Sequence, residues 1–425
     1  MVNNNLTLNS TFRQATLAGI LFLQAGGVIV IVGDVESSMI AKIIWAGIYA
    51  CTCLLVLMSS SSVFLQVKRN PGFILLALLC VVSTIWSSDR STTVHHSIAI
   101  FGGTVLGYLI ITKIKPIEFL RLIAIALFVL LAINVIMMLP NMLGCLGPSI
   151  RYSGVFPHPN MLGRISGLAV LIFLLLSFTR IIPYVLGGIG VGMGFLLLIA
   201  CDSMTSIVSL CVAFGIFLIR RMVARPVGGG SVAVTVWLIV CFGGLVGLNW
   251  SIIIDFLFGL LGRSPTLTGR TELWEGLLGA VLRKPLLGYG YSAFWGGESN
   301  LTGRIFANAG WHTQSAHNGL LGIALNIGLI GVVLFISTVG RSFIYGIKLA
   351  FMSNNLISLS LLSILAYLLL LGVSESTYMV RNSIYWLLFL ICSIYLNQIM
   401  DTKPIRTSSV IWEENENPDP NFIKD

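Results

Sequence analysis

The feature that most constrains this chain is the repetition of apolar stretches of about 20 residues along most of its length. At 1.5 Å of rise per residue, a helix of about 20 residues matches the thickness of the bilayer hydrocarbon. Charged residues make up 10% of the chain, against roughly 25% in ordinary globular proteins. The sequence therefore excludes a soluble fold and predicts an all-α polytopic membrane protein.

About twelve apolar stretches are expected to span the membrane. They lie at about 16–33, 40–60, 72–86, 97–112, 118–139, 161–179, 182–200, 206–219, 231–250, 317–338, 355–373 and 382–399. Residues 1–400 are expected to form one transmembrane domain. Residues 401–425 are acidic, contain prolines and lack an apolar face, which predicts a disordered cytoplasmic tail.

Lys and Arg predict the orientation, because positive charge near helix ends is retained on the cytoplasmic side. With the N-terminus inside, most basic residues of the short connections fall on the inner side, as Lys68, Arg220 and Arg341 do. Both termini are therefore expected in the cytoplasm. The net charge of +9 is scattered over helix ends, which favours a membrane over a nucleic-acid partner.

Two hydrophilic connections are long enough to build a site, and both are predicted outside the cytoplasm. They cover about 140–160 and about 251–316, the second between the ninth and tenth helices. In the second, apolar residues from Leu273 to Leu282 follow the i, i+3, i+4 spacing of one helix face. That helix is expected along the membrane surface or over the bundle.

The first outer connection gathers candidate ligands for an anion where the sixth helix begins. Asn160 is the expected N-cap, and the outward helix N-terminus adds partial positive charge to Arg151, His158 and Arg164. Arg164 lies just inside an outward helix end, against the rule that positive charge stays on the cytoplasmic side, and this favours a functional role for it. The alternative is that both arginines are interfacial anchors and that the prolines shape a turn.

The second outer connection supplies further candidates. Its candidate site residues are Arg270, Trp274, Tyr289, Trp311, His312 and Asn318. His317, at the outward end of the tenth helix, suits a general base for a hydroxyl group, and Glu375 is the second candidate base. The alternatives are a histidine that caps its own helix and aromatic residues of the interface belt.

These residues together carry a resemblance that covers about Gly154 to Gly331. The segments are Phe156-Pro157-His158-Pro159-Asn160, Thr268-Gly269-Arg270, Lys284-Pro285-Leu286-Leu287-Gly288-Tyr289-Gly290, Ala316-His317-Asn318 and Gly328-Leu329-Ile330-Gly331. In this order they resemble the O-antigen ligase and O-antigen polymerase superfamily. The resemblance implies a membrane glycosyltransferase of GT-C-like fold in the bacterial inner membrane, with its site on the extracytoplasmic face.

The resemblance also implies the chemistry. Such enzymes move a glycan from undecaprenyl pyrophosphate onto an acceptor sugar hydroxyl, with no metal or other cofactor, alongside a flippase and a chain-length regulator. Arg270 matches the family's pyrophosphate ligand, and His317 matches the residue near the acceptor. The expected acceptor or sugar contacts are Trp274, Tyr289, Trp311, His312 and Asn318. Direct attack by the hydroxyl would invert the anomeric configuration.

One departure concerns a cation that many family members carry after the seventh helix in a Ser-[Arg/Lys]-[Gly/Thr] motif. Here the stretch is Asp202-Ser203-Met204-Thr205-Ser206, which lacks it, and Arg151 or Arg164 is the hypothesised replacement. The departure resembles the exopolysaccharide-polymerase branch, so a polymerase is favoured. A ligase that uses lipid A-core or another acceptor stays open.

Three readings outside this family also stay open. Twelve helices with both termini inside are common in secondary transporters, although those usually place ionisable residues near the membrane midplane. Asp34 and Glu36 could share a divalent cation in a metal-dependent transferase, which chelator sensitivity would reveal. A non-catalytic scaffold would tolerate loss of Arg270 and His317.

Overall fold

The computed structural model describes residues 14–33, 38–142, 151–223, 270–310, 312–353 and 355–402. Among these residues, ten helices are long and apolar enough to cross a membrane, and a bent pair of shorter helices could form an eleventh span. The prediction of an all-α polytopic membrane protein is confirmed. The ninth predicted stretch, 231–250, and residues 403–425 of the predicted tail lie outside the described residues.

The helices follow one another along the chain in this order. The first span is Gln14–Val32, with the π-helical η1 at Leu23–Gly27 and α2 at Val28–Val32, and it is followed by α3 (Met39–Met58), α4 (Ser60–Arg69), α5 (Gly72–Val82), η2 (Ser83–Ile85), α6 (Arg90–Lys113), α7 (Pro116–Met142), α8 (Pro159–Phe178), α9 (Tyr184–Cys201), α10 (Met204–Val223), α13 (Arg270–Arg283), α14 (Phe294–Gly297), α15 (Ser299–Ala309), α16 (Gly319–Met352), α17 (Leu356–Ser374) and α18 (Ile384–Asp401).

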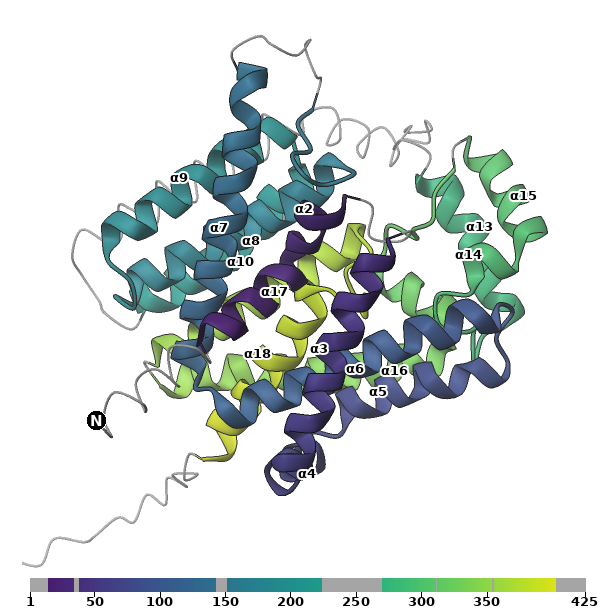
Figure 1. The fold of residues 1–425 in the computed structure, drawn as a ribbon, viewed down its shortest axis with the longest axis horizontal. Coiled ribbons are helices and arrows are strands. Elements are labelled where there is room, and N and C mark those ends of the chain that lie inside the picture. The colour runs from purple at the N-terminus through teal and green to yellow at the C-terminus, as the bar shows by residue number, and fades with distance from the viewer. Residues whose placement is uncertain are drawn as a thin grey trace, which may run out of the picture.

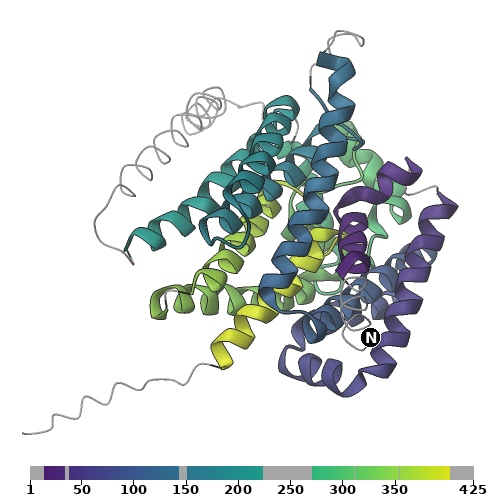
Figure 2. The ribbon, with the colours of Figure 1, turned by 60° about the vertical axis from the view of Figure 1, so that its left-hand side comes forward.

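The helices α17 and α18 form the centre of the bundle. Figure 2 shows them between the teal helices α8 to α10 and the purple N-terminal helices. α17 packs on α10 and α16, and α18 packs on α6 and α16. Most of their residues are buried, which explains why both sequences are apolar on every face.

The third predicted stretch, 72–86, needs a correction, because it is not a straight span of its own. α4 and α5 meet at an angle of 94°. The turn between them contains Asn70 and Pro71, and proline cannot donate the backbone hydrogen bond that would continue α4. α4 ends with Lys68 and Arg69 and exposes Phe64, a combination that is typical of a helix along a membrane surface.

The tenth predicted stretch, 317–338, is longer than expected and contains a break. α16 has non-helical backbone at Ile327 and Gly328, where φ of Gly328 is 69°. The segment that begins with Lys284-Pro285 covers this break. Leu329 N–H donates to the Pro285 carbonyl at 2.8 Å, and Tyr289 N–H donates to the Leu325 carbonyl at 2.8 Å. The segment thus satisfies backbone groups that a broken span would leave unpaired.

The short helices α13, α14 and α15 form a small unit, here called the outer unit, over the half of α16 that is predicted to lie toward the outside (Figure 1). Leu273 and Leu277 of α13 are fully buried in its core, whereas Leu278 and Leu282 are exposed. The helix packs on α16 as expected, but its buried face does not include Leu278 and Leu282, which the spacing had placed on the apolar face. The unit carries the chain into α16 and so positions the residues just before that helix.

Candidate active site

The start of α8 is fixed by His158 rather than by Asn160, which corrects the predicted N-cap. His158 has extended backbone, and its Nδ1 accepts a hydrogen bond from the Asn160 N–H at 3.1 Å, with Pro159 as the first helical residue. Proline at that position has no N–H to leave unpaired. The Asn160 side chain is therefore released from capping and points to other partners.

Arg151 crosses from the loop before α8 to the turn between α9 and α10. Its Nε donates to the Cys201 carbonyl at 3.0 Å, and its Nη2 donates to the Asp202 carbonyl at 2.7 Å. The same Nη2 donates to Asn160 Oδ1 at 2.7 Å. A guanidinium therefore lies on the turn 202–206, which lacks a cation of its own.

Glu375 directly follows α17 and is 4% exposed. Its Oε1 accepts a hydrogen bond from Asn160 Nδ2 at 3.1 Å. Its Oε2 lies 3.6 Å from Arg164 Nη1 and 4.0 Å from His317 Nδ1. Burying a carboxylate costs several kcal/mol unless it is paired and hydrogen-bonded, so these three neighbours are what hold it there.

Arg164 lies one turn along α8 from Asn160 and faces Glu375. Its side chain is 13% exposed, and its guanidinium lies 5.9 Å from the Tyr385 ring centre. Its buried Nε has no hydrogen-bond partner among the described residues. A buried unpaired donor costs roughly 1–3 kcal/mol, and an anionic oxygen would relieve that cost.

His317 enters the site from the opposite side with strained backbone. Its φ is 47°, a region that residues other than glycine adopt rarely. The Ser315 Oγ accepts from the His317 N–H at 3.3 Å, and Ser315 Oγ donates to Ser376 Oγ at 3.0 Å. The imidazole thus lies between Glu375 and Thr313, whose hydroxyl is 3.4 Å from Nε2.

Asn318 caps α16 and also contacts the end of α17. Its Oδ1 accepts from the Leu321 N–H at 3.0 Å, and its Nδ2 donates to the Val373 carbonyl at 3.1 Å. The second bond ties the start of α16 to the end of α17, which brings His317 and Glu375 together. The structure therefore gives Asn318 a positioning role, and we leave it out of the acceptor contacts.

The other predicted sugar contacts lie in or beside the outer unit and differ in their exposure and hydrogen bonds. Tyr289 is 1% exposed and donates to the Ala280 carbonyl at 2.8 Å, and burial raises the pKa of its hydroxyl. It is a core residue with no free ring face, so we leave it out of the sugar contacts. Trp274 donates to the Ala316 carbonyl at 2.9 Å and steadies the backbone before His317. His312 is exposed beside Phe306.

Two predicted residues lie at the edge of what the structure describes. Arg270 is the first residue of α13, but its side chain lies outside the described residues, as does all of Trp311. Asp34 and Glu36, the candidate metal pair, also lie outside them.

The sequence did not predict several uncharged residues that contact the candidate site. Tyr385 faces the Arg164 guanidinium, and Tyr367 donates to the Arg164 carbonyl at 2.8 Å. Both lie inside apolar stretches, where a tyrosine is typical of packing between membrane helices. Thr313 and Ser315 were also missed, although hydroxyl residues two and four positions before His317 are typical of a hydrogen-bonded turn.

Comparison with known proteins places this geometry in context. The model of the O-antigen ligase family matches residues 189–336. The exopolysaccharide production protein ExoQ of Rhizobium meliloti (strain 1021) is 27% identical over 216 residues, which cover 46% of this chain and 47% of that protein. The chain thus spans about half the length of this curated relative. These matches support the resemblance noted from the motifs.

Proposed function

We propose, from the resemblance to O-antigen ligases and polymerases and from the site geometry, that this chain transfers a lipid-linked glycan to a sugar hydroxyl. The donor is glycan on undecaprenyl pyrophosphate, and the site is the cluster around Glu375 on the predicted extracytoplasmic face. The observation that carries the proposal is the burial of Glu375 between Arg164 and His317. It puts a cation for a leaving pyrophosphate and a base for a hydroxyl on either side of one carboxylate.

The pyrophosphate side of the site is built by arginines. As the bond between the anomeric carbon and the pyrophosphate oxygen breaks, both bonding electrons stay with the oxygen. Fixed guanidinium donors stabilise that developing charge without reorganisation. Arg164 supplies an Nε that has no hydrogen-bond partner among the described residues, and Arg151 adds charge and aligns Asn160. Arg270 and His158 are the further ligands that we propose from the sequence.

The acceptor side requires a base. The acceptor oxygen forms the new bond to the anomeric carbon, and its proton passes to His317. Glu375 lies 4.0 Å from Nδ1, so a small approach would orient the ring and stabilise the imidazolium, as in other base–carboxylate pairs. Undecaprenyl pyrophosphate leaves, and the anomeric configuration is inverted. Trp274, His312 and Trp311 are the proposed edges of the acceptor site.

Between the two branches of the family, we favour a polysaccharide polymerase. The relative named for exopolysaccharide production supports this choice, as does the replacement of the motif cation by Arg151. The enzyme would act in the bacterial inner membrane beside a flippase and a chain-length regulator, without a metal. Chelator treatment of transfer would test the last point.

Deletion of the protein tests the choice of branch. A polymerase predicts surface glycan reduced to single repeat units. Long chains that accumulate on undecaprenyl pyrophosphate would instead identify a ligase, and unchanged glycan would overturn the proposed function.

A further inference from the structure

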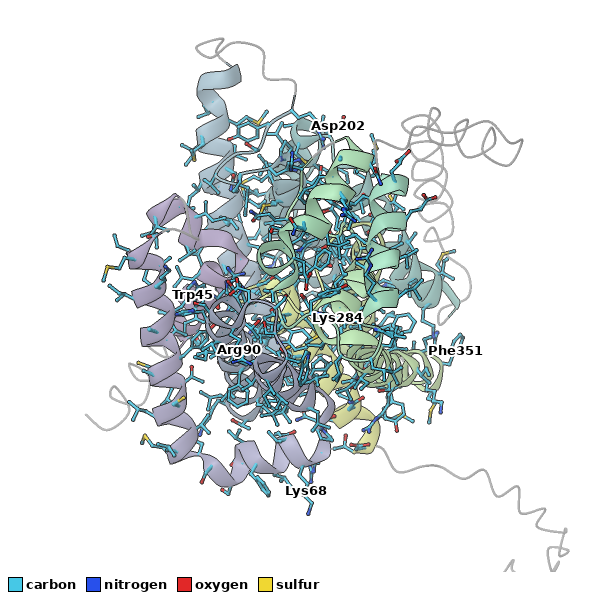
Figure 3. The ribbon with its side chains drawn as sticks, turned by 90° about the vertical axis from the view of Figure 1, so that its right-hand side faces the viewer. Trp45, Lys68, Arg90, Asp202, Lys284 and Phe351 are labelled. Atoms are coloured by element: carbon cyan, nitrogen blue, oxygen red, sulfur yellow. The ribbon has the colours of Figure 1, made fainter. Side chains whose placement is uncertain are left out.

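A second polar feature lies at the opposite end of the bundle from Glu375. It is a cavity of about 280 Å³ between the α4–α5 turn, the inner half of α16 and the inner half of α18. Asn397, on its wall, lies 13 residues after Ile384, the first residue of α18, or roughly 20 Å along the helix. In Figure 3, Lys68, beside this turn, and Asp202, beside the candidate site, mark opposite ends of the molecule.

The wall of the cavity carries an unsatisfied amide. Asn397 is 5% exposed, and its Nδ2 donates to Asn70 Oδ1 at 2.7 Å. Its Oδ1 is buried without a hydrogen-bond partner among the described residues. An unpaired buried acceptor is destabilising, so a ligand group with an N–H or O–H would be favoured beside it.

The same wall carries a positive charge. Arg341 lines the cavity and stacks over the Tyr345 ring at 5.4 Å, and no carboxylate pairs with it among the described residues. The hydroxyl groups of Ser337 and Thr338 donate to the Leu334 carbonyl at 3.0 and 2.7 Å. The cavity therefore offers a cation and an acceptor to one ligand, which must carry an anion and a hydrogen-bond donor.

The surroundings identify a lipid as the source of such a ligand. The remaining wall includes the apolar Phe73 and Leu75, and Leu75 is 46% exposed at the bundle surface. The neighbouring α4 meets α5 at 94° and exposes Phe64 where the inner membrane surface is expected. Acyl chains can therefore run along the apolar surface while the headgroup enters the cavity.

We propose that this cavity binds the headgroup of a phospholipid of the inner leaflet, with its phosphate on Arg341 and its ammonium or hydroxyl donor toward Asn397. The proposal does not depend on the glycan chemistry at Glu375. It specifies headgroup preference: phosphoethanolamine and phosphoglycerol carry both groups, whereas phosphocholine carries the phosphate but no N–H or O–H donor.

Native mass spectrometry of the full chain in detergent tests the proposal. Phosphatidylethanolamine, phosphatidylglycerol and phosphatidylcholine with identical acyl chains are titrated. We expect the first two to bind about tenfold more tightly than the third, because one hydrogen bond to a buried partner is worth on the order of 1.4 kcal/mol, or tenfold. Equal binding of all three lipids would overturn the proposal.

Two variants and one competitor locate the bound headgroup. Arg341→Gln should weaken binding of phosphatidylethanolamine about tenfold, whereas Lys348→Gln, an exposed cation farther along α16, should leave it unchanged. Asn397→Leu should remove the preference over phosphatidylcholine. Equal binding by Arg341→Gln and the parent chain, or full displacement of the lipid by millimolar inorganic phosphate, would contradict a lipid headgroup site.

Discussion

The two ends of the central helix pair α17–α18 bury different kinds of polar group. At the end that is predicted to lie outside, called the outer end, Glu375 is a buried carboxylate beside Arg164 and His317. At the inner end, Tyr395 donates to the Ile114 carbonyl at 2.8 Å and Gln398 donates to Gln66 at 2.8 Å. Neutral pairs of this kind satisfy the fold at little cost, whereas a buried charge costs far more. The difference favours a chemical role for the buried charges of the outer end and a packing role for these neutral pairs of the inner end, apart from Asn397, which lines the proposed lipid cavity.

The largest effect is expected from Arg164→Gln. Loss of a donor that stabilises developing negative charge typically lowers a rate by about 10²–10³-fold. The control is Arg180→Gln, a cation beyond the inner end of the same helix. Surface polysaccharide from a deletion strain that carries each variant measures the effect. Similar glycan yields from the two variants would contradict a special role of the outer end in the chemistry.

A second large effect is expected from His317→Asn. Asparagine tolerates positive φ, so the strained backbone at 47° is retained while the base is lost. We expect the transfer rate to fall by about 10²-fold and the thermal unfolding temperature in detergent to stay unchanged. A normal rate would rule out His317 as the base, and a lower unfolding temperature would assign it to the fold.

Gly328→Ala should lower stability rather than alter chemistry. A Cβ there would lie 2.0 Å from the Leu286 carbonyl oxygen, on backbone with φ of 69°. We expect a loss of about 1–3 kcal/mol from backbone strain, seen as a lower unfolding temperature. Gly322→Ala, in the same helix with open space around its Cβ position, is the matched control and should unfold no earlier than the parent chain.

The smallest effect is expected from Tyr395→Phe at the inner end. It removes one neutral hydrogen bond to the Ile114 carbonyl, so stability should fall by about 1 kcal/mol. Transfer activity measured on the same preparation should not change. A large loss of activity would show that the inner end also takes part in the chemistry.

The general position of the site could be predicted from the sequence, because the spacing of apolar stretches places polar residues at outward helix ends. Arg151, Asn160, Arg164, His317 and Glu375 were all candidates, and the structure brings them together. The sequence could not predict which of the polar side-chain atoms form hydrogen bonds with the backbone and so are not available to a ligand. His158 and Asn318 each use a side-chain atom to cap a helix, and only the three-dimensional arrangement shows this.

The breaks in the helices were also beyond the sequence pattern. Gly328 lies in an apolar run that is typical of a continuous span. Its break depends on hydrogen bonds that Leu329 and Ile330 donate to the carbonyls of Pro285 and Leu286, about 40 residues earlier. The turn at Asn70 and Pro71 likewise separates α4 from α5, whereas hydropathy alone predicted a span at 72–86. Long-range backbone pairing of this kind leaves no local signal in composition or periodicity.

The most direct test uses the purified protein in liposomes, with glycan on undecaprenyl pyrophosphate as the sole donor and no nucleotide sugar. Release of undecaprenyl pyrophosphate and growth of the acceptor glycan are measured together. We expect the two products in equal amounts from the parent chain and neither from the double variant Arg164→Gln, His317→Asn. No release by the folded parent chain, or undiminished release by the double variant, would contradict a transfer site around Glu375.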